Sequence, residues 1–278
     1  MRRTQHILRI LRMKRIKGLY KGSTAERLLR LFILLALLSG IAAVLLQFLA
    51  VRRFGWEPTV YRERHEVDFN PRLSINTSNM PLEVFAHDGE KIIIEYTGET
   101  ALLINEDSDS LRISREEDFK ISLFSRDMLN YKMTVWLPRK AFREIKLSTV
   151  SADISAQEFT AESFAASSRS GNVTLRDVRG IISVNTRFGD VELIFDEFSE
   201  PCAVETDSGN VSVLMPGSFG VRLDYFTDGG KFTSDFFGRE FKNHKGVLYM
   251  VSGANPVHFT VRTNSGNLVF HKRIIYIE

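Results

Sequence analysis

The sequence predicts a mainly β protein, in which a single N-terminal transmembrane helix precedes a β-solenoid, a parallel β-helix-like stack of coils. Three observations predict this fold class: an uncharged run of 21 residues, short runs of alternating apolar residues after it, and a six-residue pattern that recurs every 18 to 21 residues. The expected regions, in order, are a basic cytoplasmic arm (1–30), the transmembrane helix (31–51), a juxtamembrane linker (52–64), an N-terminal β region (65–138) and the repeat β-solenoid (139–278).

The uncharged run Leu31–Val51 has the length of a membrane span. A helix of about 20 residues, rising about 1.5 Å per residue, crosses a hydrocarbon core of about 30 Å. A buried core helix would show a polar face, which is absent from this run. A cleaved signal peptide would have an apolar region of only about 7–15 residues and a small-residue cleavage pattern after it. We therefore expect an uncleaved anchor.

Basic residues flank this run unevenly. Ten Lys and Arg lie within residues 1–30, against four in residues 52–68. Because basic flanks stay on the cytoplasmic side, we expect a single-pass protein of the cell membrane, with a cytoplasmic N-terminus and an extracytoplasmic C-terminal domain. The arm also interleaves Ile and Leu with Lys and Arg, which favours contact with an anionic inner leaflet. The alternatives are a cluster that only sets topology and, less well supported, a mitochondrial presequence.

Charge and cysteine content limit the function classes. The net charge is +3, but residues 1–30 hold ten basic residues and one acid, a balance of +9, so the rest of the chain carries −6. A body with that charge is not expected to bind nucleic acid. Cys202 is the only cysteine, so no intramolecular disulfide forms, which in an extracytoplasmic domain favours a bacterial origin. We expect Cys202 to be a buried small apolar residue.

Short alternating runs rich in β-branched residues predict strands throughout the chain after Val51. The clearest are 73–75, 82–84, 92–94, 111–113 and 133–137. The segment 105–110 contains five Asn, Asp or Ser residues and is expected to be a polar loop between two strands.

From about residue 145 a six-residue cassette recurs: a hydroxyl residue, a mostly polar pair, Gly, Asn or Asp, and then an apolar residue. Its copies are Thr149–Ile154, Ser168–Val173, Thr186–Val191, Thr206–Val211, Thr227–Phe232 and Thr263–Leu268. Glycine allows the positive φ that a tight turn often needs, and Asn or Asp bonds the local backbone. Each copy therefore predicts a turn between two short strands, with the apolar residue facing the core.

The spacing of the copies predicts one solenoid coil for each, stacked in parallel so that equivalent residues form ladders. The last interval is 36 residues, which predicts one degenerate copy between the fifth and sixth cassettes. An antiparallel sandwich with recurrent hairpins is the competing architecture.

Several of these segments resemble the bacterial putative-adhesin family, domain of unknown function 4097. The stretch Val135–Arg139, the strand 145–148, the first cassette and the closing units 253–257 and 263–267 are similar to its motifs. Ala152 and Lys231 depart from the pattern, which indicates a tolerant structural turn. The resemblance covers about residues 65–270 and implies an envelope-associated β-solenoid, often membrane-anchored, with no established activity, cofactor or catalytic residues to transfer.

The sequence contains no clear catalytic or metal-binding motif. The histidines lack metal-ligand or triad spacing, and no phosphate-binding Gly loop occurs; they are His6, His65, His87, His244, His258 and His271. We expect no catalytic, cofactor-binding or metal-binding residues and no cofactor. Two alternatives are weaker. One is a calcium ladder along Asn172, Asp190, Asn210 and Asn267. The other is a carboxylate cluster of Asp196, Glu197 and Glu200 with Arg187 one strand back, as a carbohydrate-active enzyme requires.

These observations predict a non-enzymatic, membrane-anchored extracytoplasmic β-solenoid that binds or scaffolds cell-envelope components or partner proteins, as an adhesin-like or envelope-sensing protein does. The expected partners are the lipid membrane and an envelope protein or polysaccharide, not nucleic acid. The alternative function is an envelope-localised carbohydrate-active enzyme on a β-helix fold. A third possibility is that the basic arm passes a signal to a cytoplasmic partner. The aromatic pairs 225–226 and 236–237 are expected to fill the core or, alternatively, to form an exposed patch.

Overall fold

The computed structural model describes residues 31–43, 60–115, 131–237 and 241–273, and of residues 241–245 it describes the backbone only. The chain divides into two compact units, Met1–Pro58 and Thr59–Glu278. In the first unit, residues 31–43 form a helix whose side chains are exposed, with Phe32 72% accessible. Among the described residues no helix combines the length and apolar character that a bilayer crossing requires. The expected span Leu31–Val51 continues past the described residues and stays a prediction, as does the arm before it.

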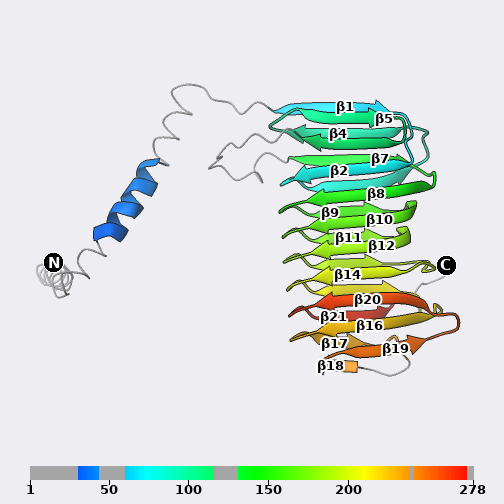
Figure 1. Cartoon of the computed structure of the whole chain (residues 1–278). Helices are drawn as coiled ribbons and strands as arrows, with labels where there is room; N and C mark the ends of the chain where they lie inside the picture. Colours follow the sequence, from blue (N-terminus) through cyan, green and yellow to red (C-terminus); the bar gives the residue numbers. More distant parts are fainter. Residues whose placement is uncertain (1–30, 44–59, 116–130, 238–240, 274–278) are drawn as a thin grey trace, which may run out of the picture. The chain divides into compact units, whose positions relative to one another are not determined.

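The second unit is built from strands stacked in two sheets (Figure 1). We call the sheet of 11 strands sheet A and the sheet of 10 strands sheet B. In spatial order, sheet A contains β1 (Tyr61–Val67), β4 (Ile92–Gly98), β7 (Lys132–Pro138), β3 (Leu82–His87), β9 (Ile154–Gln157), β11 (Val173–Arg176), β13 (Val191–Ile194), β15 (Val211–Met215), β21 (Leu268–Lys272), β17 (Lys231–Ser234) and β18 (Phe241–Lys245). Sheet B contains β19 (Leu248–Ser252), β16 (Val221–Thr227), β20 (Val257–Thr263), β14 (Cys202–Thr206), β12 (Arg179–Thr186), β10 (Thr160–Ser168), β8 (Phe142–Thr149), β2 (Arg72–Ser78), β6 (Ser110–Arg115) and β5 (Leu102–Asp107).

Each central coil contributes one strand to each sheet, and equivalent strands pair in parallel. Val173 of β11 lies opposite Ile154 of β9 on one side and Val191 of β13 on the other, so identical cassette positions stack directly. In sheet B, β10 likewise pairs in parallel with β8 and β12. The predicted parallel stacking is confirmed for these coils, and the antiparallel sandwich is wrong there.

The same coil geometry begins before the first predicted cassette. β2 pairs in parallel with β8, and β3 pairs in parallel with β9, so the turn from Thr77 to Leu82 stacks on the cassette Thr149–Ile154. The Thr77 hydroxyl donates to the Met80 carbonyl, as the Thr149 hydroxyl does to the Ala152 carbonyl. This seventh cassette has Met80 in place of Gly and Pro81 in place of Asn or Asp, so the cassette pattern does not predict it. Each sheet therefore contains strands from both sides of residue 138, the expected boundary between the N-terminal β region and the solenoid.

The end of the stack does not follow chain order. The last coil, β20 and β21, lies between the coil β14–β15 and the coil β16–β17, as the colour order in Figure 1 shows. The residues between the fifth and sixth cassettes form β18 and β19, which pair antiparallel with β17 and β16. The predicted degenerate coil in this interval is therefore wrong. The chain instead turns back over its outermost coil and then inserts its final coil beneath it.

A continuous apolar core fills the space between the sheets. The sixth cassette position is at most 1% exposed in every copy, because alternate strand residues face the interior. Phenylalanines stack through this core in edge and tilted contacts, such as Phe259 and Phe270 with ring centroids 5.5 Å apart. Tyr225 and Phe236 are buried, which confirms the core-filling alternative for these two, and Cys202 is a buried free cysteine as predicted.

Candidate functional site

The cassette turns form one edge of the stack, and their Asn and Asp side chains make a continuous ladder. The backbone N–H of each Asn or Asp donates to the side-chain oxygen of the equivalent residue in the neighbouring coil. The bonds run from Asn172 to Asp153 (2.7 Å), Asp190 to Asn172 (2.9 Å), Asn210 to Asp190 (2.7 Å), Asn267 to Asn210 (3.1 Å) and Lys231 to Asn267 (3.0 Å). These oxygens are therefore used to satisfy backbone donors of the next coil.

The two departures from the motif lie at the two ends of this turn ladder. Lys231 belongs to the outermost coil, where its backbone N–H donates to the Asn267 side chain. No described coil beyond it presents a cassette N–H that would need an acceptor from the side chain at position 231. Ala152 belongs to the first cassette, Thr149–Ile154, in which Asp153 occupies the Asn or Asp position. The Ala152 carbonyl oxygen packs against Gly171 of the next coil. A Cβ at Gly171 would overlap that oxygen, and the same overlap recurs from coil to coil.

The glycines of the cassette are required for close approach and not for a left-handed backbone. Gly209 would place a Cβ onto the Gly189 carbonyl oxygen, and Gly266 would place one onto the Gly209 oxygen. Neither glycine has a positive φ, and the described glycines with positive φ are Gly180, Gly246 and Gly253. The positive-φ explanation from the sequence is therefore wrong, because the stacking distance between coils leaves no room for a side chain.

Hydroxyl groups form a second, buried ladder behind the turns. Thr186 is 4% exposed, and its hydroxyl donates to the Gly189 carbonyl at 2.8 Å and lies 3.0 Å from the Thr206 hydroxyl. The Thr206 oxygen in turn accepts the Gly209 N–H at 3.0 Å. The cassette edge is thus bonded internally along the central coils.

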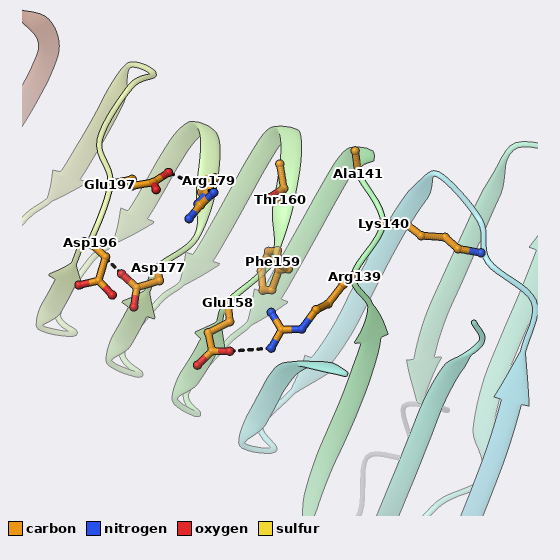
Figure 2. A pocket seen from close by; sticks show the side chains of 10 residues that line it. All are labelled: Arg139, Lys140, Ala141, Glu158, Phe159, Thr160, Asp177, Arg179, Asp196 and Glu197. Carbon is orange, nitrogen blue, oxygen red and sulfur yellow. Dashed lines mark hydrogen bonds and ion pairs between the residues drawn. The ribbon is translucent and has the colours of Figure 1, made fainter. Parts of the chain in front are cut away.

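The opposite edge of the stack carries a groove of about 480 Å³ (Figure 2). It is lined by Arg139, Lys140, Ala141, Glu158, Phe159, Thr160, Asp177, Arg179, Asp196 and Glu197. Three acids, Glu158, Asp177 and Asp196, follow the ends of β9, β11 and β13, so one acid is presented by each successive coil. Glu158 and Asp177 have φ values of 60° and 50°, a left-handed turn that carries the chain from sheet A toward sheet B.

Arginines from neighbouring turns pair with the acids of this edge. Arg139 contacts Glu158 at 2.9 Å and Asp88 at 3.1 Å, and Arg179 contacts Glu197 at 3.1 Å. All of these side chains are at least half exposed, so each pair contributes little to stability but fixes an alternating pattern of charge. The paired Glu158 carboxylate also raises the pKa of Arg139 above its ordinary value.

A tighter group closes one end of the groove. The Asp196 N–H donates to the Asp177 carboxylate at 2.6 Å, and Arg273 bonds the Asp196 carboxylate and lies 3.9 Å from that of Asp177. Burial is the main cause that raises the pKa of Asp177, and the neighbouring Asp196 carboxylate adds to it, while the Asp196 N–H and Arg273 oppose the shift. The two acids therefore differ in environment although they lie on adjacent coils.

A second groove of about 490 Å³ lies on sheet B, over β2, β6 and β8. It is lined by Arg72, Leu73, Ser74, Ser110, Leu111, Arg112, Glu144 and Lys146. Arg72 pairs with Asp109 at its rim. This surface is mixed in charge and has no row of equivalent side chains from successive coils.

The structure brings together only part of the predicted carboxylate cluster. Asp196 and Glu197 line the first groove, whereas Glu200 does not. Arg187 lies at the opposite end of β13, on the cassette edge, where it pairs with Asp207 at 3.1 Å. The sequence analysis missed Arg139, Glu158, Asp177, Arg179 and Arg273. An acid four residues after the cassette apolar position, as in Ile154 to Glu158 and Val173 to Asp177, was the available signal.

Within the described part of the chain, no group of three or more His, Cys, Asp or Glu side chains is arranged to hold a metal ion. Three described histidines each contact an acid: His65 with Glu63 at 2.8 Å, His258 with Asp224 at 2.6 Å and His271 with Asp235 at 3.0 Å. Asp235 accepts bonds from the Lys272 N–H and from His271, and these lower its pKa against the opposing effect of burial.

Residues 70–193 match the family model described as Toastrack DUF4097. Residues 70–193 of this chain are therefore similar to the Toastrack domain. The match ends within β13, whereas the parallel coils continue with the same register through β14 and β15. The resemblance noted from the cassettes is thereby confirmed.

Comparison with solved structures gives matches over most of the chain. One is described as a "putative cell adhesion protein" from Clostridium sporogenes ATCC 15579; it is 16% identical, with 77% of this chain and 100% of that chain covered and a TM-score of 0.49. Another is a "putative adhesin" from Bacteroides fragilis NCTC 9343, 10% identical, with 77% and 98% covered and a TM-score of 0.34. No curated protein matches the chain.

Proposed function

We propose that this protein is a membrane-anchored, extracytoplasmic Toastrack protein that binds or scaffolds a cell-envelope component or partner protein without catalysing a reaction. The anchor is the uncharged run Leu31–Val51, whose first part is helical and exposed over residues 31–43. The basic residues of 1–30 lie on the cytoplasmic side in this proposal and contact the anionic inner leaflet.

The observation that carries the binding role is the groove with one acid per coil and interleaved arginines. Glu158, Asp177 and Asp196 come from three successive coils, about 4.8 Å apart as neighbouring strands are. A ligand that repeats along its length, such as a polysaccharide or an extended peptide, can make equivalent contacts with each coil. Because Arg139 and Arg179 alternate with these acids, the groove suits a ligand that carries both donor and acceptor groups.

A second candidate, a carbohydrate-active enzyme, is favoured by the pair Asp177 and Asp196. Glycoside hydrolysis needs two carboxyl groups whose pKa values differ, and burial raises the pKa of Asp177. Arg273 bonds the Asp196 carboxylate and lies 3.9 Å from that of Asp177, where it opposes the rise in the Asp177 pKa, so it disfavours Asp177 as a proton donor. We therefore place binding first.

Labelling of a single cysteine tests the anchoring and orientation. Ser208 is exposed on the cassette edge, so Ser208→Cys in a Cys202→Ala background is expected to react with a membrane-impermeant maleimide in intact cells. The chain with its native Cys202 is the control, since that thiol is buried. Labelling of Ser208→Cys only after lysis, or recovery of the protein in the soluble fraction, contradicts the proposed topology.

A matched pair of charge reversals tests the binding site. Arg179→Glu reverses a groove arginine that pairs with Glu197 at 3.1 Å, and Arg262→Glu reverses one that pairs with Glu205 at 3.4 Å on sheet B. With purified envelope fragments as the probe, cosedimentation is expected to fall at least about tenfold for Arg179→Glu and to stay near wild type for Arg262→Glu. Equal binding by the two variants, or none by the wild type, contradicts the site.

Turnover separates the two candidates. Purified protein incubated with those fragments is expected to release no soluble reducing sugar. Sugar release that Asp177→Asn or Asp196→Asn abolishes would establish the enzyme instead.

A further inference from the structure

Among the described residues, the two sheets end in four edge strands, and one of them differs from the others. β1 has the sequence YRERHEV, β5 has LLINED and β18 has FKNHK, so each carries charged residues. β19 has the sequence LYMVS and carries none. Charged residues on an edge strand prevent its unpaired backbone groups from joining another sheet, so β19 alone among these edges is unprotected.

The outward face of β19 and the residue before it is apolar and accessible. Val247 is 51% exposed, Tyr249 is 68% exposed and Val251 is 63% exposed. Tyr249 also contacts Phe226 edge to face, with the ring centroids 5.7 Å apart, and Arg262 lies over the other side of this contact, 5.1 Å from the Phe226 ring. An apolar patch with a charged rim is typical of a protein interaction surface.

Within the part of the chain that the structure describes, the backbone of β19 is paired on one side only. Its residues lie antiparallel to β16, with Met250 opposite Leu223 and Tyr249 opposite Asp224, and β19 is the last strand of sheet B. The outer side therefore presents unpaired N–H and C=O groups to a further strand.

We propose that β19 pairs antiparallel with β19 of a second copy of this chain, which joins the two B sheets across a two-fold axis at Met250. In this register Tyr249 of each copy lies opposite Val251 of the other. An aromatic residue opposite a β-branched residue is a favourable cross-strand pair. Leu248, Met250 and Ser252 complete the pairing on the core-facing side, where Leu248 and Met250 already pack against the core.

Charge selects a second β19 over the other edges of the molecule. Pairing with β1 would bury parts of its Arg and Glu side chains against Tyr249 and Val251, which costs desolvation without an opposite charge in return. Pairing with β5 would do the same for Glu106 and Asp107. A copy of β19 brings no charge to the contact, and a two-fold contact closes on itself, so it stops at a dimer and forms no filament.

The contact is one short strand on each copy, so we expect a weak dimer that is best detected by cross-linking in place. In a paired antiparallel position two Cα atoms are about 4.5–5.5 Å apart, within the range of about 4.4–6.8 Å that a disulfide spans. Full-length Met250→Cys, oxidised in intact cells with copper phenanthroline, is therefore expected to form a disulfide-linked dimer. Two co-expressed copies with different tags identify the product as a pair of this chain.

Leu103→Cys is the matched control, because Leu103 is a 43% exposed residue of the charged edge strand β5. It is expected to give no dimer under the same oxidation. Adding Val251→Lys to Met250→Cys is expected to lower the cross-linked fraction at least about fivefold, since it places a charge opposite Tyr249 in both halves of the contact. Adding Leu103→Lys to Met250→Cys is expected to leave the cross-linked fraction unchanged.

Val251 is largely exposed, so a melting temperature near wild type is expected for Val251→Lys and separates lost pairing from lost folding. Cross-linking of Met250→Cys at the level of Leu103→Cys overturns the proposal. A cross-linked product that contains another protein and no second tagged copy also overturns it, because the occupant would then be a foreign strand.

Discussion

The two turn edges of the stack use the same kinds of side chain for different purposes. On the cassette edge, Asp190 and Asn210 accept backbone N–H groups from the next coil. On the groove edge, Glu158 and Asp196 face solvent and pair with arginines from other turns. Both edges repeat once per coil, but the Asn and Asp oxygens of the cassette edge accept backbone N–H groups, whereas Glu158 and Asp196 of the groove edge pair with arginine side chains.

The difference arises from what the backbone leaves unsatisfied. At the cassette turn, the N–H of the Asn or Asp position has no partner in its own coil and takes the side-chain oxygen of the coil beside it. At the groove turn, the N–H of Glu158 donates to the Arg176 carbonyl, and that of Asp177 donates to the Ile194 carbonyl. Because these two N–H groups are already bonded, the Glu158 carboxylate is free for an ion pair with Arg139, whereas the Asp177 carboxylate accepts the Asp196 N–H. A ladder of Asn and Asp is therefore not by itself a binding site.

Gly209→Val is expected to have the largest effect on this comparison, because it breaks the cassette edge outright. The added Cβ overlaps the Gly189 carbonyl oxygen, which belongs to the backbone and cannot move aside. We expect a loss of about 3 kcal/mol or more in the free energy of unfolding, measured by urea denaturation. Gly229→Ala is the control, since its Cβ would lie 3.8 Å from the Asn264 oxygen. Similar midpoints for the two variants would refute the close-packing explanation.

Thr186→Val removes a buried hydroxyl from the ladder behind the cassette turns. The Gly189 carbonyl and the Thr206 hydroxyl each lose a partner, so we expect a loss of about 1–2 kcal/mol. Thr174→Val, at a half-buried position on the outer face of β11, is expected to stay near wild type. Equal stability of both variants would show that the hydroxyl ladder does not stabilise the stack.

Asn210→Ala removes one acceptor from the exposed Asn and Asp ladder. The Asn267 N–H then bonds water instead, so we expect a loss of about 0.5–1 kcal/mol, less than for the buried hydroxyl. Asn185→Ala, at an exposed strand position of β12, serves as the reference. If Asn210→Ala costs more than Thr186→Val, the relative importance of the two ladders is reversed.

Asp177→Asn is expected to have the smallest effect, visible only as a change in pH dependence. The folded protein raises the pKa of Asp177, so the folded state holds this proton more tightly than the unfolded state does. Its contribution to stability is therefore complete below the ordinary pKa of 3.8 and is lost as the pH rises through the raised value. As the pH rises through this range, we expect the melting temperature of the wild type to fall relative to that of Asp177→Asn. A difference between the two melting temperatures that does not change with pH would contradict this prediction.

Much of the fold was predictable because the cassette combines turn chemistry with a regular interval. The parallel register and the inward apolar position follow from that repeat, as Val173 and Val191 show. The turn at Thr77 was not predicted because it lacks the Gly and the Asn or Asp of the cassette and is separated from Thr149 by strands β3 to β8 rather than by one coil. The insertion of the last coil was also not predictable, because β14 pairs in parallel with β20 and not with β16, the next strand of sheet B along the chain, and no local pattern distinguishes these two partners.

The groove was predictable only in part for a related reason. Asp196 and Glu197 are adjacent in the sequence, so their proximity needed no fold. Arg139 and Arg273 reach the same edge from chain positions more than a hundred residues apart, which only the stacking of coils brings together. Arg187 was wrongly grouped with Asp196 and Glu197. The four-residue strand β13 separates them, because Arg187 precedes it on the cassette edge and the two acids follow it on the groove edge.

The sequence by itself determined the class of fold, the coil length and the side chains that face the core, because these depend on local turns and on the two-residue period of a strand. The tertiary structure alone decided the order of the last coils, the reason for the cassette glycines and the composition of the groove. Each of these depends on which backbone lies about 4.8 Å away in the neighbouring coil, and no local pattern encodes the identity of that neighbour.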